Sequence, residues 1–194
     1  MQVSNVYVKK YLNEEPRKKR HFGLNYLQSF NIELKCLQRL KGYDNICQLI
    51  DYDVDQTTLT LEWAGHNLNY FFDPIKKYKK HKRRLKKKEI KIDYKLTNSH
   101  TDLTRIDFKS QIESAFNIFE KENIVHFDLG PWNICLKNYN ITIIDFGCAV
   151  LDGIPLYPCL EEPYQKFLSN GGWATQKEKT FQRINSILRY IKNE

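Results

Sequence analysis

Apolar residues recur along the chain with two periods, and each period predicts one kind of element. β-Branched and aromatic residues dominate three segments that we expect to form strands: 3–12, 46–53 and 57–62. Helical spacing of apolar residues predicts four helices: 24–41, 67–72, 104–122 and 178–192. Two short apolar runs, 134–136 and 141–144, flank the polar turn 137–140 and predict a β-hairpin. Together these elements predict an α+β fold.

The ends of the predicted hairpin carry polar residues suited to phosphate and metal chemistry. Asn133 precedes the first strand and Asp145 follows the second. Closing the hairpin therefore brings an amide and a carboxylate to the same end. Oxygen ligands of this kind suit Mg²⁺, which we expect Asn133 and Asp145 to hold. Asp128 lies five residues before Asn133 and can accept a proton from an incoming hydroxyl.

This region resembles the catalytic core of the protein-kinase family. The family's H-R-D-L-x-x-x-N loop is matched at His126, Asp128, Leu129 and Asn133, and its D-F-G motif at residues 145–147. The two motifs at this separation, with strands between them, are far more specific than either alone, although a chance hairpin with polar ends is the alternative. The resemblance implies a single two-lobed kinase-like domain over residues 1–194. It assigns residues 1–65 to a small lobe with its hinge and 66–194 to a large lobe.

The resemblance also implies an ATP site in the N-terminal part. Lys9, in the place of the lysine of V-A-I-K, would hold the α- and β-phosphates, with Lys10 as its rival. Glu33 is the acidic residue of helix 24–41 and would orient that lysine, and we predict an ion pair between Lys9 and Glu33.

The hinge that receives adenine would lie within residues 59–68. Leu61 would back the adenine pocket, and Glu62 and Ala64 would offer backbone groups to the base edge. The cofactors implied by the resemblance are ATP and Mg²⁺, and Asp128 is the catalytic residue, assisted by Lys9 and Glu33.

Several positions depart from the family pattern. Only eight residues precede Lys9, so we expect a reduced small lobe without the Gly-rich loop. Phe127 replaces an arginine, while Gly130 and Ile154 replace a lysine and its threonine partner. Only 33 residues follow Glu161, so we expect a truncated large lobe, with no aspartate to brace the catalytic loop. The chain resembles the minimal kinases that viruses encode and that pathogenic bacteria inject.

Two functions of different classes follow from these matches and departures. The first is ATP- and Mg²⁺-dependent phosphoryl transfer to protein Ser or Thr hydroxyls. The alternative is a catalytically weak or inactive kinase-like decoy, a pseudokinase, that binds and modulates a host kinase or another regulatory protein. Transfer to a small molecule or to a nucleic-acid end is a third possibility.

Charge is concentrated in one segment. Residues 76–91 hold eleven Lys or Arg and one Glu, so the net charge of +8 becomes about −2 without them. We expect this insertion to be extended and to contact nucleic acid, an acidic membrane surface or a protein partner, unless it only improves solubility. It also resembles a nuclear localisation signal.

Cellular location and redox state follow from composition. No apolar run reaches the roughly 18–20 residues of a transmembrane segment, and no apolar signal core begins the chain. We therefore expect an intracellular protein, cytoplasmic or nuclear, in its own cell or in a host cell. The five cysteines are expected to be reduced thiols.

Overall fold

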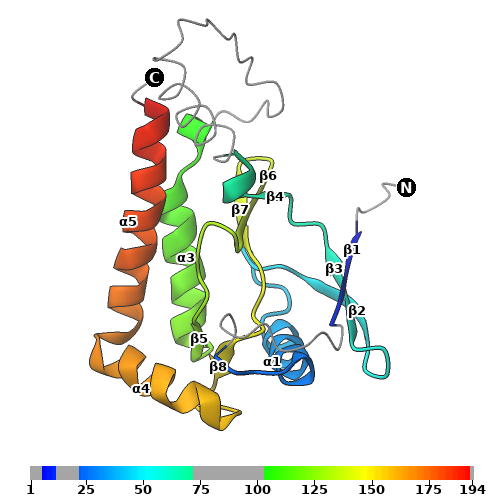
Figure 1. The fold of residues 1–194 in the computed structure, drawn as a ribbon. Coiled ribbons are helices and arrows are strands. Elements are labelled where there is room, and N and C mark those ends of the chain that lie inside the picture. The colour runs from blue at the N-terminus through cyan, green and yellow to red at the C-terminus, as the bar shows by residue number, and fades with distance from the viewer. Residues whose placement is uncertain (1–5, 12–21, 72–102, 193–194) are drawn as a thin grey trace, which may run out of the picture.

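The computed structural model describes residues 6–11, 22–71 and 103–192, and within them it has a mixed α+β architecture (Figure 1). The described strands form three small antiparallel sheets, and helices lie beside them. The α+β class predicted from the sequence is thus confirmed. The basic segment 76–91 and most of the predicted loop 13–23 lie outside the described residues.

The N-terminal sheet has the strand order β1-β3-β2, with β1 at Val6–Lys10, β2 at Leu49–Asp53 and β3 at Thr58–Glu62. Its central strand turns Leu59 and Leu61 into the core. Helix α1, Tyr26–Arg39, packs nearby and begins at a capping box that Asn25 forms with Gln28.

The strand predicted over residues 46–53 begins later, at Leu49. The preceding residues pair elsewhere: Ile46 forms a parallel bridge with Ile143, and the Cys47 N–H donates to the Ile143 carbonyl at 2.9 Å. This pairing ties the N-terminal sheet to the C-terminal hairpin.

The predicted hairpin is confirmed as β6, Ile134–Lys137, and β7, Asn140–Ile143. Its two turn residues, Asn138 and Tyr139, both have positive φ, as a two-residue hairpin turn that follows the strand twist requires. Strand β4, His66–Asn67, extends this sheet by pairing with β6. A third sheet, β5 at Ile124–His126 with β8 at Ala149–Leu151, was not predicted.

Three helices complete the C-terminal part: α3 at Phe108–Lys121, α4 at Glu161–Ser169 and α5 at Gly172–Lys192. Helix α3 starts later than predicted because Asp107 caps it by accepting from the Ser110 N–H. Helix α5 starts six residues earlier than predicted, and α4 was missed. Figure 1 shows α3 and α5 side by side, with α4 at their lower end.

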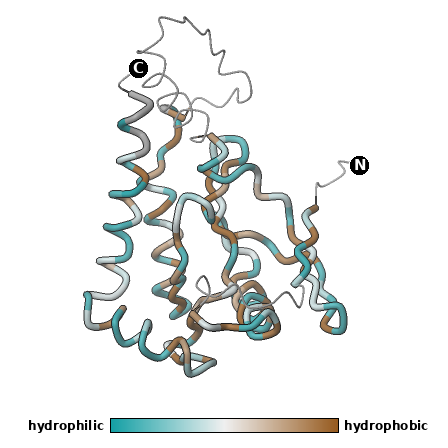
Figure 2. The backbone as a smooth tube through the Cα atoms, viewed as in Figure 1, coloured by the Kyte–Doolittle hydropathy of each residue, from teal (hydrophilic) through white to brown (hydrophobic). Residues whose placement is uncertain are grey.

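The core lies where α1, α3 and the hairpin meet, around the fully buried rings of Phe30, Phe116, Phe119 and Phe146. Figure 2 shows that α5, by contrast, is mostly hydrophilic. Among the described helices, none is long and apolar enough to cross a bilayer.

All five cysteines are free thiols, as predicted, and four of them are buried. Burial raises the pKa of the Cys148 thiol to about 12. This thiol, which directly follows the D-F-G residues, is therefore protonated at neutral pH and a weak nucleophile.

Candidate functional site

Lys9 lies at the centre of a charged cluster drawn from three parts of the chain. Its Nζ lies 2.6 Å from Glu33 Oε2 on α1 and 2.9 Å from Asp145 Oδ1 after β7. Lys9 pairs across the sheet with the buried Leu59 and shares its face, whereas Lys10 is exposed. The predicted Lys9–Glu33 ion pair is present, and Glu33 pairs with Lys9, not with its rival Lys10.

Burial sets the electrostatics of this cluster. The Glu33 side chain is 1% exposed, and burial together with the nearby Asp145 charge raises its pKa despite Lys9. Burial alone would lower the pKa of Lys9, but its two carboxylate partners outweigh it and raise the pKa. Burial likewise opposes ionisation of Asp145, yet the charge of Lys9 and its hydrogen bond lower that pKa. Lys9 is therefore firmly cationic between two carboxyl groups.

Asp145 reaches Lys9 through an unusual backbone conformation. Its φ is +64°, in the left-handed region, which costs a non-glycine residue roughly 1–2 kcal/mol. The following Phe146 is fully buried against His126, with ring centroids 4.9 Å apart, and anchors the turn. Core packing thus holds the carboxylate in a strained position facing the lysine.

Asn133 and Asp128 are joined by hydrogen bonds. Asn133 Nδ2 donates to the Asp128 carbonyl at 2.9 Å and to Asp128 Oδ2 at 3.2 Å. The amide nitrogen is thus used within the loop, and the amide oxygen is the atom that Asn133 has for a cation. The Ile144 N–H donates to the Asn133 carbonyl at 3.0 Å, which brings Asn133 and Asp145 to the same hairpin end, as predicted.

His126 supports the loop from inside the core. Its Nε2–H donates to the Ile144 carbonyl at 3.0 Å, just before Asp145. Burial lowers the pKa of the imidazole, so the ring is neutral at physiological pH. Among the described residues, its Nδ1 has no hydrogen-bond partner.

Trp132 is a site residue that the sequence reasoning missed. Its indole Nε1–H donates to Asp128 Oδ1 at 3.1 Å. A Cβ on Gly130 would lie only 2.5 Å from the Trp132 ring. The glycine noted as a departure from the kinase pattern is therefore the space that the indole ring needs. The only sequence signal was the adjacency of a tryptophan to Asn133.

Helix α5 braces the same loop with three side chains on one face. Trp173 Nε1 donates to the Ile124 carbonyl at 3.0 Å, and Gln176 Nε2 donates to the His126 carbonyl at 2.7 Å. Arg183 Nη1 donates to the Leu129 carbonyl at 3.1 Å. The helix has no aspartate, as the sequence shows, but the loop is held by donors to its carbonyls instead.

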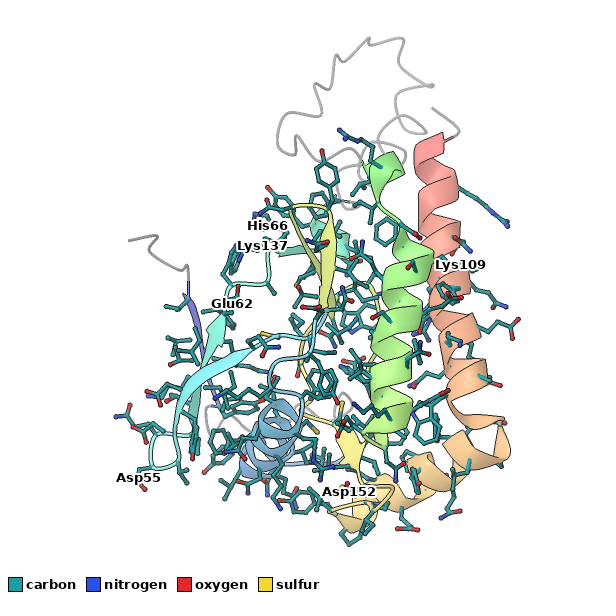
Figure 3. The ribbon with its side chains drawn as sticks, turned by 180° about the vertical axis from the view of Figure 1, so that it is seen from behind. Asp55, Glu62, His66, Lys109, Lys137 and Asp152 are labelled. Carbon is teal, nitrogen blue, oxygen red and sulfur yellow. The ribbon has the colours of Figure 1, made fainter. Side chains whose placement is uncertain are left out.

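The expected adenine hinge is placed in part. Leu61 is buried, on the same face as Leu59. The Glu62 N–H already donates to the Gln48 carbonyl at 2.9 Å. The Glu62 carbonyl accepts from the Cys47 thiol at 3.7 Å, which leaves it one lone pair for a base edge. The Glu62 carboxylate pairs with Lys137 Nζ at 3.2 Å, and the two residues lie close together in Figure 3. Ala64 is half-buried in the segment that follows.

The donor set fits Mg²⁺ only as a shared site. Among the described residues, no group of three or more His, Cys, Asp or Glu side chains could hold a metal alone. Asn133 and Asp145 supply two oxygens, and Mg²⁺ in nucleotide sites takes most of its remaining ligands from phosphates and water.

The sequence was also compared with known proteins. No protein-family model matches the chain, and no curated protein matches it.

Proposed function

We propose that this chain is a minimal protein kinase that transfers a phosphoryl group from ATP to Ser or Thr hydroxyls of a protein. The observation that carries the proposal is Lys9 held between Glu33 and Asp145, at 2.6 and 2.9 Å. Three elements converge to keep one cation beside the predicted metal ligands. A structural ion pair needs one partner, whereas a phosphate site needs a fixed cation next to a carboxylate that holds Mg²⁺.

Each residue then has a role that its contacts support. Asn133 and Asp145 would hold Mg²⁺, which supplies charge neutralisation on the β- and γ-phosphates. Lys9 binds the α- and β-phosphates, and Glu33 fixes its position. Asp128 accepts the proton of the acceptor hydroxyl while that oxygen forms its bond to the γ-phosphorus. The bond from phosphorus to the β–γ bridging oxygen breaks, and ADP leaves with the electron pair.

The arrangement of elements supports a two-lobed, kinase-like organisation within this proposal. The sheet β1-β3-β2 with α1 corresponds to a reduced small lobe that contributes Lys9, Glu33 and the hinge. The hairpin with α3, α4 and α5 corresponds to a shortened large lobe that contributes Asp128, Asn133 and Asp145. The family resemblance, not a match to a known protein, supports this reading.

A kinase-like decoy is the second candidate function, and the surroundings of Asp128 favour it. Trp132 already donates to Asp128 Oδ1 and lies over Gly130, where kinases carry a cation. In the described chain, β1 pairs only with β3, and three of its residues are about half exposed: Val6, Tyr7 and Val8. A partner protein could bind such an edge without any catalysis.

Two variants separate these functions. Thermal shift with ATP should show stabilisation that requires Mg²⁺ and is lost in Asp145→Ala. Radiolabel transfer from ATP should fall about 10²–10⁴-fold in Asp128→Asn, with ATP binding unchanged. Asp55→Asn changes an exposed residue of the turn between β2 and β3 (Figure 3). It is the matched control and should label as wild type does. Equal labelling by wild type and Asp128→Asn would remove the kinase proposal in favour of the decoy.

Location and contacts belong to the same proposal. We infer that segment 76–91, with its eleven cations, directs the protein to the nucleus or to an acidic surface such as nucleic acid. Action in the cytoplasm or nucleus, within a host cell if the chain is a viral or effector kinase, is consistent with an ATP-dependent activity.

A further inference from the structure

A cavity of about 500 Å³ lies beside the loop that carries Asp128, between this loop and helices α4 and α5. Its wall includes Phe127 and Leu129, the two chain neighbours of Asp128. The volume falls within the range of about 300–1,000 Å³ that is typical of ligand sites. Whatever occupies this cavity contacts the loop that carries the proposed catalytic aspartate, although Asp128 itself is not in the lining.

One side of the cavity is aromatic. Phe22, Phe127 and Phe167 line it, with ring centroids 5.7 Å apart for Phe22 and Phe127 and 6.4 Å apart for Phe127 and Phe167. Phe22 is 42% exposed at the rim, and the buried Leu129 is also in the lining. Phe127 stands where the kinase pattern has an arginine, so an aromatic wall replaces a charge. These rings pack against one another and form an apolar wall on which an aromatic side chain can pack.

The other side is cationic. Lys166 on α4 and both Lys179 and Arg183 on α5 line the cavity, against the single carboxylate of Glu162. Arg183 Nη1 donates one N–H to the Leu129 carbonyl. A guanidinium has five N–H donors, so Arg183 keeps others for an occupant of the cavity. The lining therefore favours an occupant that carries negative charge close to its apolar group.

Gln176 adds a directional feature. Its Nε2 is used on the His126 carbonyl, while its Oε1 is buried and has no hydrogen-bond partner in the described part of the chain. Gln176 belongs to the cavity lining. A buried acceptor without a partner is costly, and a peptide N–H would satisfy it once the Gln176 amide turned its oxygen toward the cavity. A fatty acid or an inorganic anion has no such donor.

We propose that this cavity binds an acidic peptide segment that inserts an aromatic side chain, and that the segment belongs to the protein acceptor. The binding itself stands on the cavity alone, and only its assignment to the acceptor rests on the proposed kinase function. The aromatic side chain packs against the three phenylalanine rings, the flanking carboxylates face the lysines, and a peptide N–H meets Gln176. This places the acceptor chain against the loop that carries Asp128.

The test uses fluorescein-labelled peptides and the full chain, without ATP, by fluorescence anisotropy. The probe is Asp-Glu-Phe-Asp-Glu, and its controls replace Phe by Ser or all four acids by Lys. The probe should bind, more weakly at high salt, and both control peptides should bind at least about tenfold more weakly. The Ser control matters because the basic segment 76–91 attracts any acidic peptide.

A matched pair of variants locates the binding. Lys166→Glu/Lys179→Glu should lower affinity for the probe about tenfold or more. Lys35→Glu/Lys109→Glu makes the same charge change at exposed lysines outside the cavity and should have a much smaller effect. Figure 3 shows Lys109 on α3. All four lysines are exposed, so both variants should fold, which melting curves check.

Three results would overturn the inference. Equal binding of the Phe and Ser peptides would show that the probe is attracted only by the positive charge of the chain. An equal loss of affinity in the Lys166→Glu/Lys179→Glu and Lys35→Glu/Lys109→Glu variants would show the same. Tighter binding to phosphatidylserine-containing vesicles than to the probe, lost in the cavity variant, would make the occupant a membrane surface. The two proposals fail separately: probe binding without phosphoryl transfer refutes only the kinase function, and transfer without probe binding refutes only the cavity's role.

Discussion

Removing the ammonium group of Lys9 should destabilise the protein far more than removing that of the neighbouring Lys10. In Lys9→Met the alkyl stem is largely kept, but Glu33, 1% exposed, loses the cation that faces it. One of its oxygens, Oε1, already lacks a hydrogen-bond partner among the described residues. The variant therefore leaves a buried carboxyl group without the cation that faced it. Lys10→Met, on the exposed face of the same strand, is the control.

The magnitude follows from burial. Breaking a buried ion pair by removing one partner costs about 3–5 kcal/mol. The loss of the ion pair between Lys9 and Asp145 adds little to this free energy, because the Asp145 side chain is 40% exposed and solvent screens its charge. The Lys9 side chain is itself 22% exposed, so we take the low end, about 3 kcal/mol. For a chain of this length that lowers Tm by about 6–12 °C. Lys10→Met should stay within about 0.5 kcal/mol of wild type.

Urea denaturation of three variants tests this reasoning. Lys9→Met/Glu33→Met removes both charges, and its free energy of unfolding should recover most of the loss, because an apolar pair can replace a buried ion pair at little cost. A Lys9→Met loss below about 1 kcal/mol would refute the claim that Glu33 depends on Lys9. A double variant as unstable as the single one would show that packing, not charge, carries the loss.

Three further predictions concern other parts of the chain. Gly130→Ala should destabilise the protein by about 1–3 kcal/mol because its Cβ would meet the Trp132 ring at 2.5 Å, and Gly130→Ala/Trp132→Ala should recover that loss in the same denaturation assay. The folded pKa of His126 lies below its ordinary value of 6.5, so the unfolded chain takes up a proton first as the pH falls. Stability should therefore drop between about pH 7 and pH 5 more steeply in wild type than in His126→Gln. Deleting residues 76–91, which lie outside the described residues, should leave Tm within a few degrees, because the segment has few apolar side chains, while lowering affinity for single-stranded RNA; a collapsed fold on deletion would contradict this.

The hairpin and the charged cluster were predictable because their signals are local. Two apolar runs around a polar turn specify β6 and β7, and the turn then brings Asn133 and Asp145 together without further information. Lys9 and Glu33 required the family pattern in addition, since nothing local indicates which of two adjacent lysines faces inward. Lys9 faces inward because it pairs with Leu59, and that register is a property of the folded sheet.

The missed elements lack such signals. Strands β5 and β8 are three residues each, and more than twenty residues of chain separate them. They are therefore too short to show a hydrophobic period, and no turn sequence links them. Helix α4 buries none of its residues and contains Pro163, which its first turn tolerates, so neither an apolar stripe nor a favourable composition marks it. The contact of Gly130 with Trp132 exists only in three dimensions, and a lysine would displace that ring.

The support around Asp128 bears on the choice between kinase and decoy. Helix α5 fixes the carbonyls of His126 and Leu129 on either side of it, and Asn133 and Trp132 fix its carboxylate. A decoy needs only a surface of the right shape. Four hydrogen bonds that order a buried loop add nothing to that surface, and ordering the loop costs conformational entropy. Catalysis does need it, because a proton acceptor misplaced by about 1 Å loses on the order of 10²-fold in rate. The ordering of the loop by α5 and Asn133 therefore supports the proposal of transfer. The Trp132 contact with Asp128 Oδ1 and the exposed edge of β1 are the features that support the decoy.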